Sequence, residues 1–281
     1  KIVRNVANAA IEVKRASKEI GSSLEADIEV YLGEEYLKNS KDVNLSEYII
    51  TSKAEAKPMV NDNKFKAFYS DMITCTQCTR LVSFREKIAK EKRKQYINEE
   101  YWGKPVPGYG DINAKILFVG LAPAAHGGNR TGRVFTGDKS ADFLMKCMHY
   151  TGLANQINSD YRDDGLKLKN AYMTAMLKCV PPGDKPTSGE LKMCFSYFNR
   201  EMELLTNLKT IVALGKIAFD GTLKYFKQFD DLKTKNFPFG HGKFYQMPHG
   251  INLVGCYHPS PRNVNTGKLD FEMMTDLFKK I

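Results

Sequence analysis

Short apolar runs alternate with polar, glycine-rich segments through most of the chain. These runs are residues 116–121, 171–178, 210–214 and 251–257. They are short and continuous, and the first is bounded by Asp and Asn before it and by Pro and Gly after it, which predicts buried β-strands. Between the runs, apolar residues recur at helical spacing. Alternating strands and helices predict an α/β fold, in which helices cover both faces of a parallel sheet.

Helix boundaries are predicted at several points between and after these strands. Asp138 is a good N-cap, and the residues that follow it are apolar at helical spacing. Ser188 is expected to cap a helix that runs to about residue 208, and an amphipathic helix ends the chain. Further helices are predicted over residues 79–94 and 216–226, and a loop rich in Gly and Pro over 101–110.

The first sixty residues follow a different pattern. Apolar spacing predicts an amphipathic helix over residues 1–20, and strands over 26–31 and 48–51. A polar stretch beginning at Lys57, with Asn-Asp-Asn, predicts a linker. We therefore expect three parts, which are an N-terminal segment (1–60), a linker (61–72) and a larger domain (73–281).

Residues that could take part in binding or catalysis follow the ends of the predicted strands. A loop rich in glycine and in cationic side chains, residues 120–138, follows the first strand, and Cys179, Gly215 and His258 follow the other three. Open α/β sheets bind ligands at the carboxyl ends of their strands, so we expect the active site at this edge. The alternative for residues 120–138 is a flexible connector, but connectors rarely hold so many cationic and planar groups.

Four of the six cysteines form a candidate metal site. They are Cys75 and Cys78, in a Cys-x-x-Cys pair, with Cys179 and Cys194. Thiolates bind soft metals, and four of them suit a zinc ion or a [4Fe–4S] cluster equally well. Spacing does not separate the two. The alternative is that Cys179 and Cys194 are ordinary core cysteines, as we expect of Cys147 and Cys256, which lie in apolar runs.

Charge separates the two parts of the chain. The net charge is +10, but residues 1–62 hold nine Lys/Arg and eleven Asp/Glu, so the remainder carries +12. A basic domain indicates a polyanionic partner, usually nucleic acid, although charge also serves general solubility. Since no apolar run approaches the ~18 residues that span a bilayer, we expect a cytoplasmic protein without membrane contact. Lys1 is not an initiator Met, so we expect a fragment or a processed product.

At these motifs the chain resembles the type 5 uracil-DNA glycosylases. The resemblance covers roughly residues 70–281. It is carried by the cysteine pairs and by GLAPAAHGGNRTGR from Gly120, KCVPPGDKP from Lys178 and HPSP from His258, with YWG at 101–103 and DDGL at 163–166. It implies a three-layer α/β/α fold with a four-stranded parallel sheet, a [4Fe–4S] cluster rather than zinc, and hydrolysis of the bond between uracil and deoxyribose in damaged DNA. Double-stranded DNA is the expected substrate, and a monomer the expected state.

The resemblance and the chemistry of this reaction suggest roles for individual residues. We expect His258 to stabilise negative charge on the departing base, Asn129 to orient the attacking water and Phe135 to stack on the base. The other residues expected around the base are Gly120, Leu121, Ala122, His126 and Ala175. Those expected to contact DNA phosphates or the gap left by the flipped base are Arg130, Arg133, Ser260 and Arg262.

Two alanines depart from the pattern of the related type 4 enzymes. Ala122 stands where those enzymes have Glu, and Ala175 where they have Asn. Both agree with a type 5 assignment, and they leave the loop after the first strand without an evident general base. An alanine at 175 also removes a base-reading amide, so we expect larger deaminated bases such as hypoxanthine to be accepted.

The N-terminal segment resembles a different family. Residues 6–26, with IGSSLEA at 20–26, are similar to the C-terminal, tRNA-contacting part of isoleucyl-tRNA synthetase. This resemblance covers only the first sixty residues and implies no synthetase activity, because the acylating domain is absent from it. Two alternatives to a glycosylase therefore stay open. One is a catalytically inactive iron–sulfur protein that binds nucleic acid, and the other is a tRNA-related accessory protein.

Overall fold

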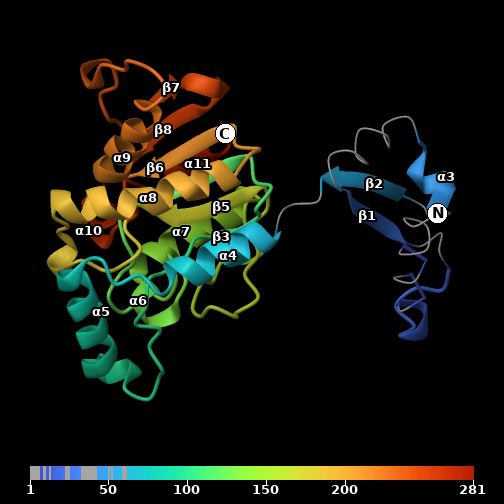
Figure 1. Ribbon diagram of the computed structural model, residues 1–281, viewed down its shortest axis with the longest axis horizontal. Coiled ribbons are helices and arrows are strands. Elements are labelled where there is room, and N and C mark those ends of the chain that lie inside the picture. Colours follow the sequence, from blue (N-terminus) through green and yellow to red (C-terminus); the bar gives the residue numbers. More distant parts are fainter. Residues whose placement is uncertain are drawn as a thin grey trace. The chain divides into compact units, whose positions relative to one another are not determined.

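The computed structural model describes residues 7–8, 11–12, 14–22, 26–32, 43–49, 51, 53–58 and 62–281. The chain forms two compact units, Lys1–Asp62 and Asn63–Ile281 (Figure 1). Among the residues described, no helix is both long enough and apolar enough to cross a bilayer.

The larger unit is built on a six-stranded sheet with the order β3-β5-β4-β6-β8-β7. The strands are β3 (Tyr109–Gly110), β4 (Ile116–Gly120), β5 (Ala171–Ala175), β6 (Thr210–Leu214), β7 (Phe244–Gln246) and β8 (Asn252–Cys256). The four middle strands are parallel, which confirms the predicted parallel sheet. The edge strands β3 and β7 pair antiparallel and were not predicted. They span two and three residues, which is too short to show a hydrophobic period.

Helices cover both faces of this sheet, as predicted (Figure 1). The helices of this unit are α4 (Asp62–Met72), α5 (Thr79–Glu91), α6 (Gly128–Thr131), α7 (Lys139–Tyr150), α8 (Ser188–Leu204), α9 (Lys216–Phe226), α10 (Pro261–Asn265) and α11 (Phe271–Phe278). Short 3₁₀ helices are η2 (Lys94–Tyr96), η3 (Pro182–Asp184), η4 (Thr234–Asn236) and η5 (Pro248–Gly250). In β4, Phe118 packs with α7 and α11, whereas Leu117 and Val119 pack with α8 and α9. Successive strand side chains point to opposite faces, so a strand buried on both sides is apolar throughout.

Two sequence expectations about helices in the larger unit are corrected. The expected linker contains α4, whose Phe65, Phe68 and Met72 are buried at helical spacing. Its polar beginning concealed that pattern. The N-cap of α8 is Thr187 rather than Ser188, and the helix ends at Leu204. Thr187 forms a capping box with Glu190, in which each side chain binds the other residue's backbone N–H.

The smaller unit contains a parallel pair of strands, β1 (Asp27–Leu32) and β2 (Lys53–Pro58), and the helix α3 (Leu45–Ile49). The helix predicted near the N-terminus is present where the chain is described, and its Ala7 and Ile11 are buried with Ile49. The strand predicted over residues 48–51 is wrong for residues 48 and 49, which belong to α3. The pattern there is helical, since Leu45 and Ile49 are buried one helical turn apart. Ile50 lies outside the described residues.

Candidate active site

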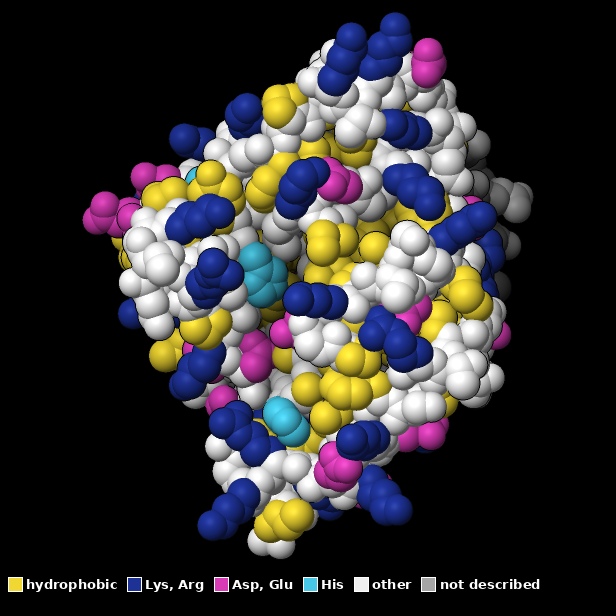
Figure 2. Space-filling view, turned by 90° about the vertical axis from the view of Figure 1, so that its left-hand side faces the viewer, with side chains coloured by type: hydrophobic (Ala, Val, Ile, Leu, Met, Phe, Trp, Pro, Cys, Tyr) yellow, Lys and Arg dark blue, Asp and Glu magenta, His cyan; other side chains and the backbone are white. Residues whose placement is uncertain are grey.

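A cavity of about 390 Å³ lies at the carboxyl edge of the sheet, beside the end of β4. The strand order reverses at β4, since β5 lies on one side of it and β6 on the other. Such a reversal leaves a crevice that open α/β folds use for ligands. The lining of the cavity includes Leu121, Ala122, Phe135, His258 and Ser260, all predicted site residues. Figure 2 shows this side of the molecule, where Lys and Arg side chains surround a hollow that holds hydrophobic and histidine side chains.

Two rings face the cavity. The centroids of Phe135 and His258 are 6.1 Å apart, with 35° between the ring planes. Gly120, at the end of β4, allows the phenyl ring to lie where it does, because a Cβ on Gly120 would be 2.8 Å from two atoms of the ring. Phe135 itself has φ +47°, a left-handed conformation that is strained for a bulky side chain. Gly120 therefore serves the site by making room for Phe135.

Buried polar groups hold the backbone around Phe135. Ser159 Oγ donates a hydrogen bond to the Phe135 carbonyl at 2.9 Å. Arg133, which is 5% exposed, forms an ion pair with Asp164 at 2.7 Å and donates to Thr136 Oγ1 at 2.8 Å. We expected Arg133 to contact DNA, but the structure directs its guanidinium inward, where it braces the loop.

Arg130 is also directed inward. It is 4% exposed, forms an ion pair with Glu99 and donates from Nε to the His126 carbonyl at 2.8 Å. Its guanidinium lies 4.0 Å from the ring centre of Tyr96. Arg130 thus fastens the loop to the segment after α5, so the expected phosphate contact does not fit its position.

Asn129 does not line the cavity that holds His258. Its side chain is 1% exposed, and Nδ2 donates to the Arg85 carbonyl of α5 at 3.2 Å. Asn129 thus lies outside the lining of the cavity in which we expected it to orient the water. Its Nδ2 joins the loop to α5, whereas its Oδ1 is buried and has no hydrogen-bond partner among the described residues.

Carboxylates that the sequence did not single out as catalytic, Asp138 and Asp184, line the cavity instead. Asp138 Oδ1 caps α7 by accepting from the backbone N–H groups of Ser140 and Ala141 at 2.9 and 3.0 Å. Burial raises the pKa of Asp138. The sequence marked this residue only as a helix cap, although a carboxylate at the end of a glycine-rich ligand loop was a usable signal.

His258 is positioned by the turn after β8. Its carbonyl accepts from Asn263 Nδ2 at 2.8 Å, and Ser260 caps α10 through Oγ. Burial lowers the pKa of His258, while the charge of nearby Asp184 acts in the opposite direction. A lowered pKa favours the neutral imidazole, which still has one N–H to donate. Arg262 is exposed on α10 and forms none of the ion pairs found within the described residues.

Two other predicted residues lie next to the cavity rather than in its lining. His126 accepts or donates a hydrogen bond with Tyr101 Oη at 3.0 Å and lines a neighbouring groove of about 720 Å³, which shares Asp138 with the cavity. Ala175 pairs with Gly120 across β4 and β5, and is 1% exposed in the cluster against which Phe135 packs. Ala175 therefore contributes to the support of the site.

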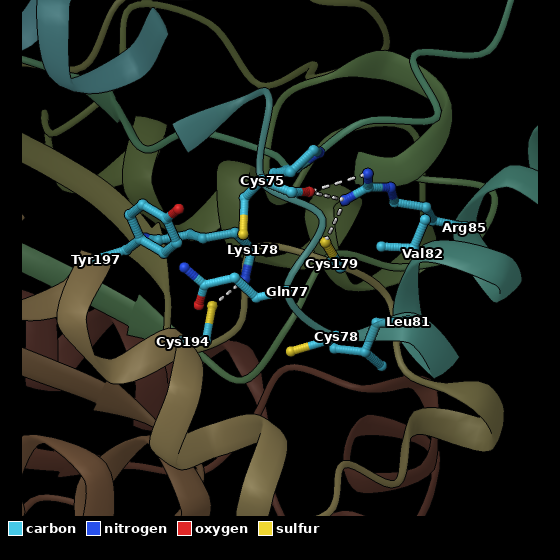
Figure 3. Close-up of a pocket in the computed structure, with 11 residues that line it drawn as sticks. Cys75, Gln77, Cys78, Leu81, Val82, Arg85, Lys178, Cys179, Cys194 and Tyr197 are labelled. Atoms are coloured by element: carbon cyan, nitrogen blue, oxygen red, sulfur yellow. Dashed lines mark hydrogen bonds between the residues drawn. The ribbon is translucent and has the colours of Figure 1, made fainter. Parts of the chain in front are cut away.

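The four predicted cysteine ligands surround one small cavity (Figure 3). Cys75 and Cys78 precede α5, Cys179 follows β5 and Cys194 lies in α8. Cys179 Sγ accepts from Arg85 Nη1 at 3.0 Å, and Cys194 Sγ accepts from the Lys178 backbone N–H at 3.3 Å. Both other cysteines of the sequence, at 147 and 256, are buried in the core between the sheet and α7.

The four thiols at this cavity are donors of the type that hold a zinc ion or a [4Fe–4S] cluster. Among the described residues, no group of three or more His, Cys, Asp or Glu side chains has the arrangement of a metal site. Four thiols around a shared cavity, with N–H groups directed at two of the sulfurs, agree in donor type with the expected cluster, which stays a prediction.

Comparison with known proteins agrees with this geometry. Residues 107–281 match the family model described as "Uracil DNA glycosylase superfamily". A type-5 uracil-DNA glycosylase from Mycobacterium tuberculosis is 42% identical over 207 residues, which cover 73% of this chain and 76% of that protein. One from Thermus thermophilus is 43% identical over 212 residues, 75% of this chain and 94% of that protein. A type-4 enzyme from Archaeoglobus fulgidus is 29% identical over 160 residues, 55% and 70% of the two chains.

The chain therefore belongs to the uracil-DNA glycosylase superfamily. The resemblance to the type 5 enzymes is confirmed, and with it the assignment as a hydrolase of N-glycosyl bonds. An isoleucine–tRNA ligase from Pelagibacter ubique is 52% identical over 54 residues, 19% of this chain and 6% of that ligase. The second resemblance is thus also confirmed, over a small part of the ligase.

Proposed function

We propose that this chain excises uracil and other deaminated bases from double-stranded DNA, leaving an abasic site. The observation that carries the proposal is the placement of Phe135 and His258 at one cavity, at the strand edge where this fold binds ligands. A base within a duplex cannot be attacked, so it must be flipped into such a pocket at a cost of a few kcal/mol. The phenyl ring offers the flipped base a surface for stacking.

His258 acts on the leaving group in this mechanism. Cleavage of the N-glycosidic bond places negative charge on the base and positive charge on the sugar. A neutral imidazole N–H, fixed in the turn after β8, stabilises the charge that develops on a carbonyl oxygen of the base. The backbone that carries the ring is held by Asn263, which limits the reorganisation needed during the reaction.

Asp138 is the proposed group for orienting or activating the water, in place of Asn129. Its Oδ1 is engaged at the start of α7, and it lines the same cavity as His258. Backbone donors fix the carboxylate, and Oδ2 belongs to the same fixed group. The negative charge of Asp138 also favours the positive charge that develops on the sugar.

Arg262 and Ser260 are the proposed DNA contacts. Ser260 lines the cavity, and the exposed side chain of Arg262 follows it on α10. A guanidinium beside the mouth of the base pocket suits either a phosphate or the gap left in the duplex.

A monomeric state and a cytoplasmic location stay predictions. Light scattering of the pure protein tests the first, and cell fractionation tests the second.

A [4Fe–4S] cluster is the proposed cofactor, held by Cys75, Cys78, Cys179 and Cys194. When bound, it would cross-link the segment before α5, the end of β5 and α8, and we assign it no step in the hydrolysis. Protein purified without oxygen should be brown and contain iron and sulfide. Stoichiometric zinc without iron would contradict this assignment.

Acceptance of hypoxanthine is proposed because Ala175, which lies next to the cavity, carries no amide that could extend towards the base. An amide at this position, beside Gly120, would demand one hydrogen-bonding pattern and would be left buried and unpaired by another base. With a methyl group there, selectivity rests on the weaker pairing of a damaged base, which flips more readily. Ala175→Asn should therefore narrow the range towards uracil. A wild-type enzyme confined to uracil would contradict this proposal.

The proposal is tested by incubating pure protein with labelled duplexes that carry uracil or hypoxanthine, with a cytosine duplex as the matched control. Release of the free base and an alkali-labile site are expected for the first two only. Binding of these duplexes without release would favour the inactive iron–sulfur protein. Deletion of residues 1–62 tests the tRNA-related alternative, since glycosylase activity should survive in residues 63–281, which form their own compact unit.

A further inference from the structure

Arg85 of α5 lies between the cysteine cavity and the loop that forms the base pocket, residues 121–138, here called the base-pocket loop. Its side chain is 4% exposed and lines the cavity of the four cysteines. Nη1 donates to Cys179 Sγ at 3.0 Å, and both Nη atoms lie 3.1 Å from the Cys75 carbonyl (Figure 3). One guanidinium thus binds two of the four residues proposed as cluster ligands.

The charge of Arg85 is uncompensated by any carboxylate within the described part of the chain. None of the ion pairs found there includes Arg85, whereas Lys178, the other cation at this cavity, pairs with Glu201 at 2.5 Å. The Nε atom of Arg85 is buried and lacks a hydrogen-bond acceptor among those residues. A buried cation and an unpaired donor are costly unless an anion lies beside them. Four thiolates around a cluster supply that anion.

The backbone of Arg85 contacts the base-pocket loop. Its carbonyl accepts from Asn129 Nδ2 at 3.2 Å, and the Asn129 carbonyl in turn accepts from the Gly103 N–H at 3.0 Å. Ala122, which lines the base cavity, packs in the same hydrophobic cluster as all four cysteines. A single residue of α5 therefore touches the cysteine site through its side chain and the base-pocket loop through its main chain.

We propose that Arg85 is a positioning residue, which neutralises the filled cysteine site and transmits its occupancy to residues 121–138. This inference rests on the proposed cofactor and on the proposed function of the loop. Hydrogen bonds from a charged donor to a thiolate are strong, and such bonds are known to tune metal sites. With the cysteine site filled, Arg85 is held on both sides, and Asn129 is held with it.

The test uses three variants of the full chain purified without oxygen. Arg85→Gln removes the positive charge. Arg85→Lys keeps the charge but loses the pair of N–H groups that donate to the Cys75 carbonyl. Arg80→Gln is the matched control, because Arg80 lies on the same helix but pairs with Glu190 at 2.7 Å. The measurements are the reduction potential of the cluster, iron retention against a chelator, and hydrogen exchange of residues 121–138.

Arg85→Gln should lower the potential, because loss of a positive charge disfavours the more negative, reduced cluster. We expect at least a tenfold shift in the reduction equilibrium, which is 59 mV for one electron. Iron loss and loop exchange should be faster in the same variant. Arg85→Lys should keep most of the potential but show the faster exchange, and Arg80→Gln should match the wild type in both.

A potential and a loop exchange in Arg85→Gln equal to those of Arg80→Gln would overturn the inference. If Arg85→Gln fails to fold, the fast exchange expected of Arg85→Lys decides in its place. Wild-type protein without iron would overturn both this inference and the cofactor assignment. A wild type that holds iron and shows the expected Arg85 effects, but releases no base, would refute only the proposed function.

Discussion

Replacement of Gly120 by alanine tests whether the base pocket depends on the position of Phe135. The new Cβ would lie 2.8 Å from Cε2 and Cζ of the ring, whereas carbon atoms in contact are about 3.5–4.0 Å apart. The ring must therefore retreat by roughly 0.7–1.2 Å. The backbone of Phe135 resists that movement, because its carbonyl is bound by Ser159 and the adjacent Thr136 by Arg133. The ring is then expected to turn into the cavity that takes the base.

A displacement of about 1 Å in a catalytic arrangement can cost about a hundredfold in rate. We therefore expect Gly120→Ala to lower the single-turnover excision of uracil by about 10- to 100-fold, and overpacking to cost about 1–3 kcal/mol of stability. Gly189→Ala is the matched control, since the nearest atom to its Cβ would be 3.9 Å away. Rates are compared by alkaline cleavage of a labelled duplex, below the melting temperature of each variant. A folded Gly120→Ala enzyme with the wild-type rate would refute this account of Phe135 and Gly120.

Three further substitutions separate the proposed roles. His258→Ala should slow base release by a hundredfold or more, about 3–4 kcal/mol for one lost donor, with little change in the affinity for an uncleavable duplex. Arg262→Ala should do the reverse, weakening binding and lowering its dependence on salt concentration, measured by titration at several ionic strengths. Asp138→Asn should slow excision by about 10²–10⁴-fold. Burial raises the pKa of Asp138, so its carboxylate is protonated at a higher pH than an ordinary aspartate. The wild-type rate should therefore begin to fall at that higher pH as the solution is acidified. Asp138→Asn should lack this fall.

The parallel sheet and its helices were predictable, because buried strands such as β4 are apolar throughout and end at glycine or proline. The same logic placed His258 and the loop after β4 at one edge. The predicted cysteine set also converges on one cavity, since its members flank elements that the sequence defines well. The helix α4 was missed because its first residues are polar and only its later turns bury phenylalanine.

The direction of a side chain was the part that the sequence could not provide. Arg130, Arg133 and Asn129 stand in a polar, glycine-rich loop, which suggests exposure, yet each is at least 95% buried. The carboxylate partners of the two arginines, Glu99 and Asp164, lie 31 residues away in the chain, so the sequence does not indicate these pairs. A sequence reading identifies the residue types at a site, whereas tertiary partners decide which of them face the ligand.

The inward arginines explain how the loop can hold Phe135 in a strained conformation. A bulky residue with positive φ persists only where its surroundings over-determine it. Arg133 fixes the backbone next to Phe135 by binding Thr136, and it also pairs with Asp164 outside the loop. Arg130 fixes it further by binding the carbonyl of Gly137 and pairing with Glu99. Their charges are thereby neutralised inside the protein. Attraction of DNA must then come from cations outside the loop, such as exposed Arg262 and the Lys and Arg side chains that surround the hollow in Figure 2.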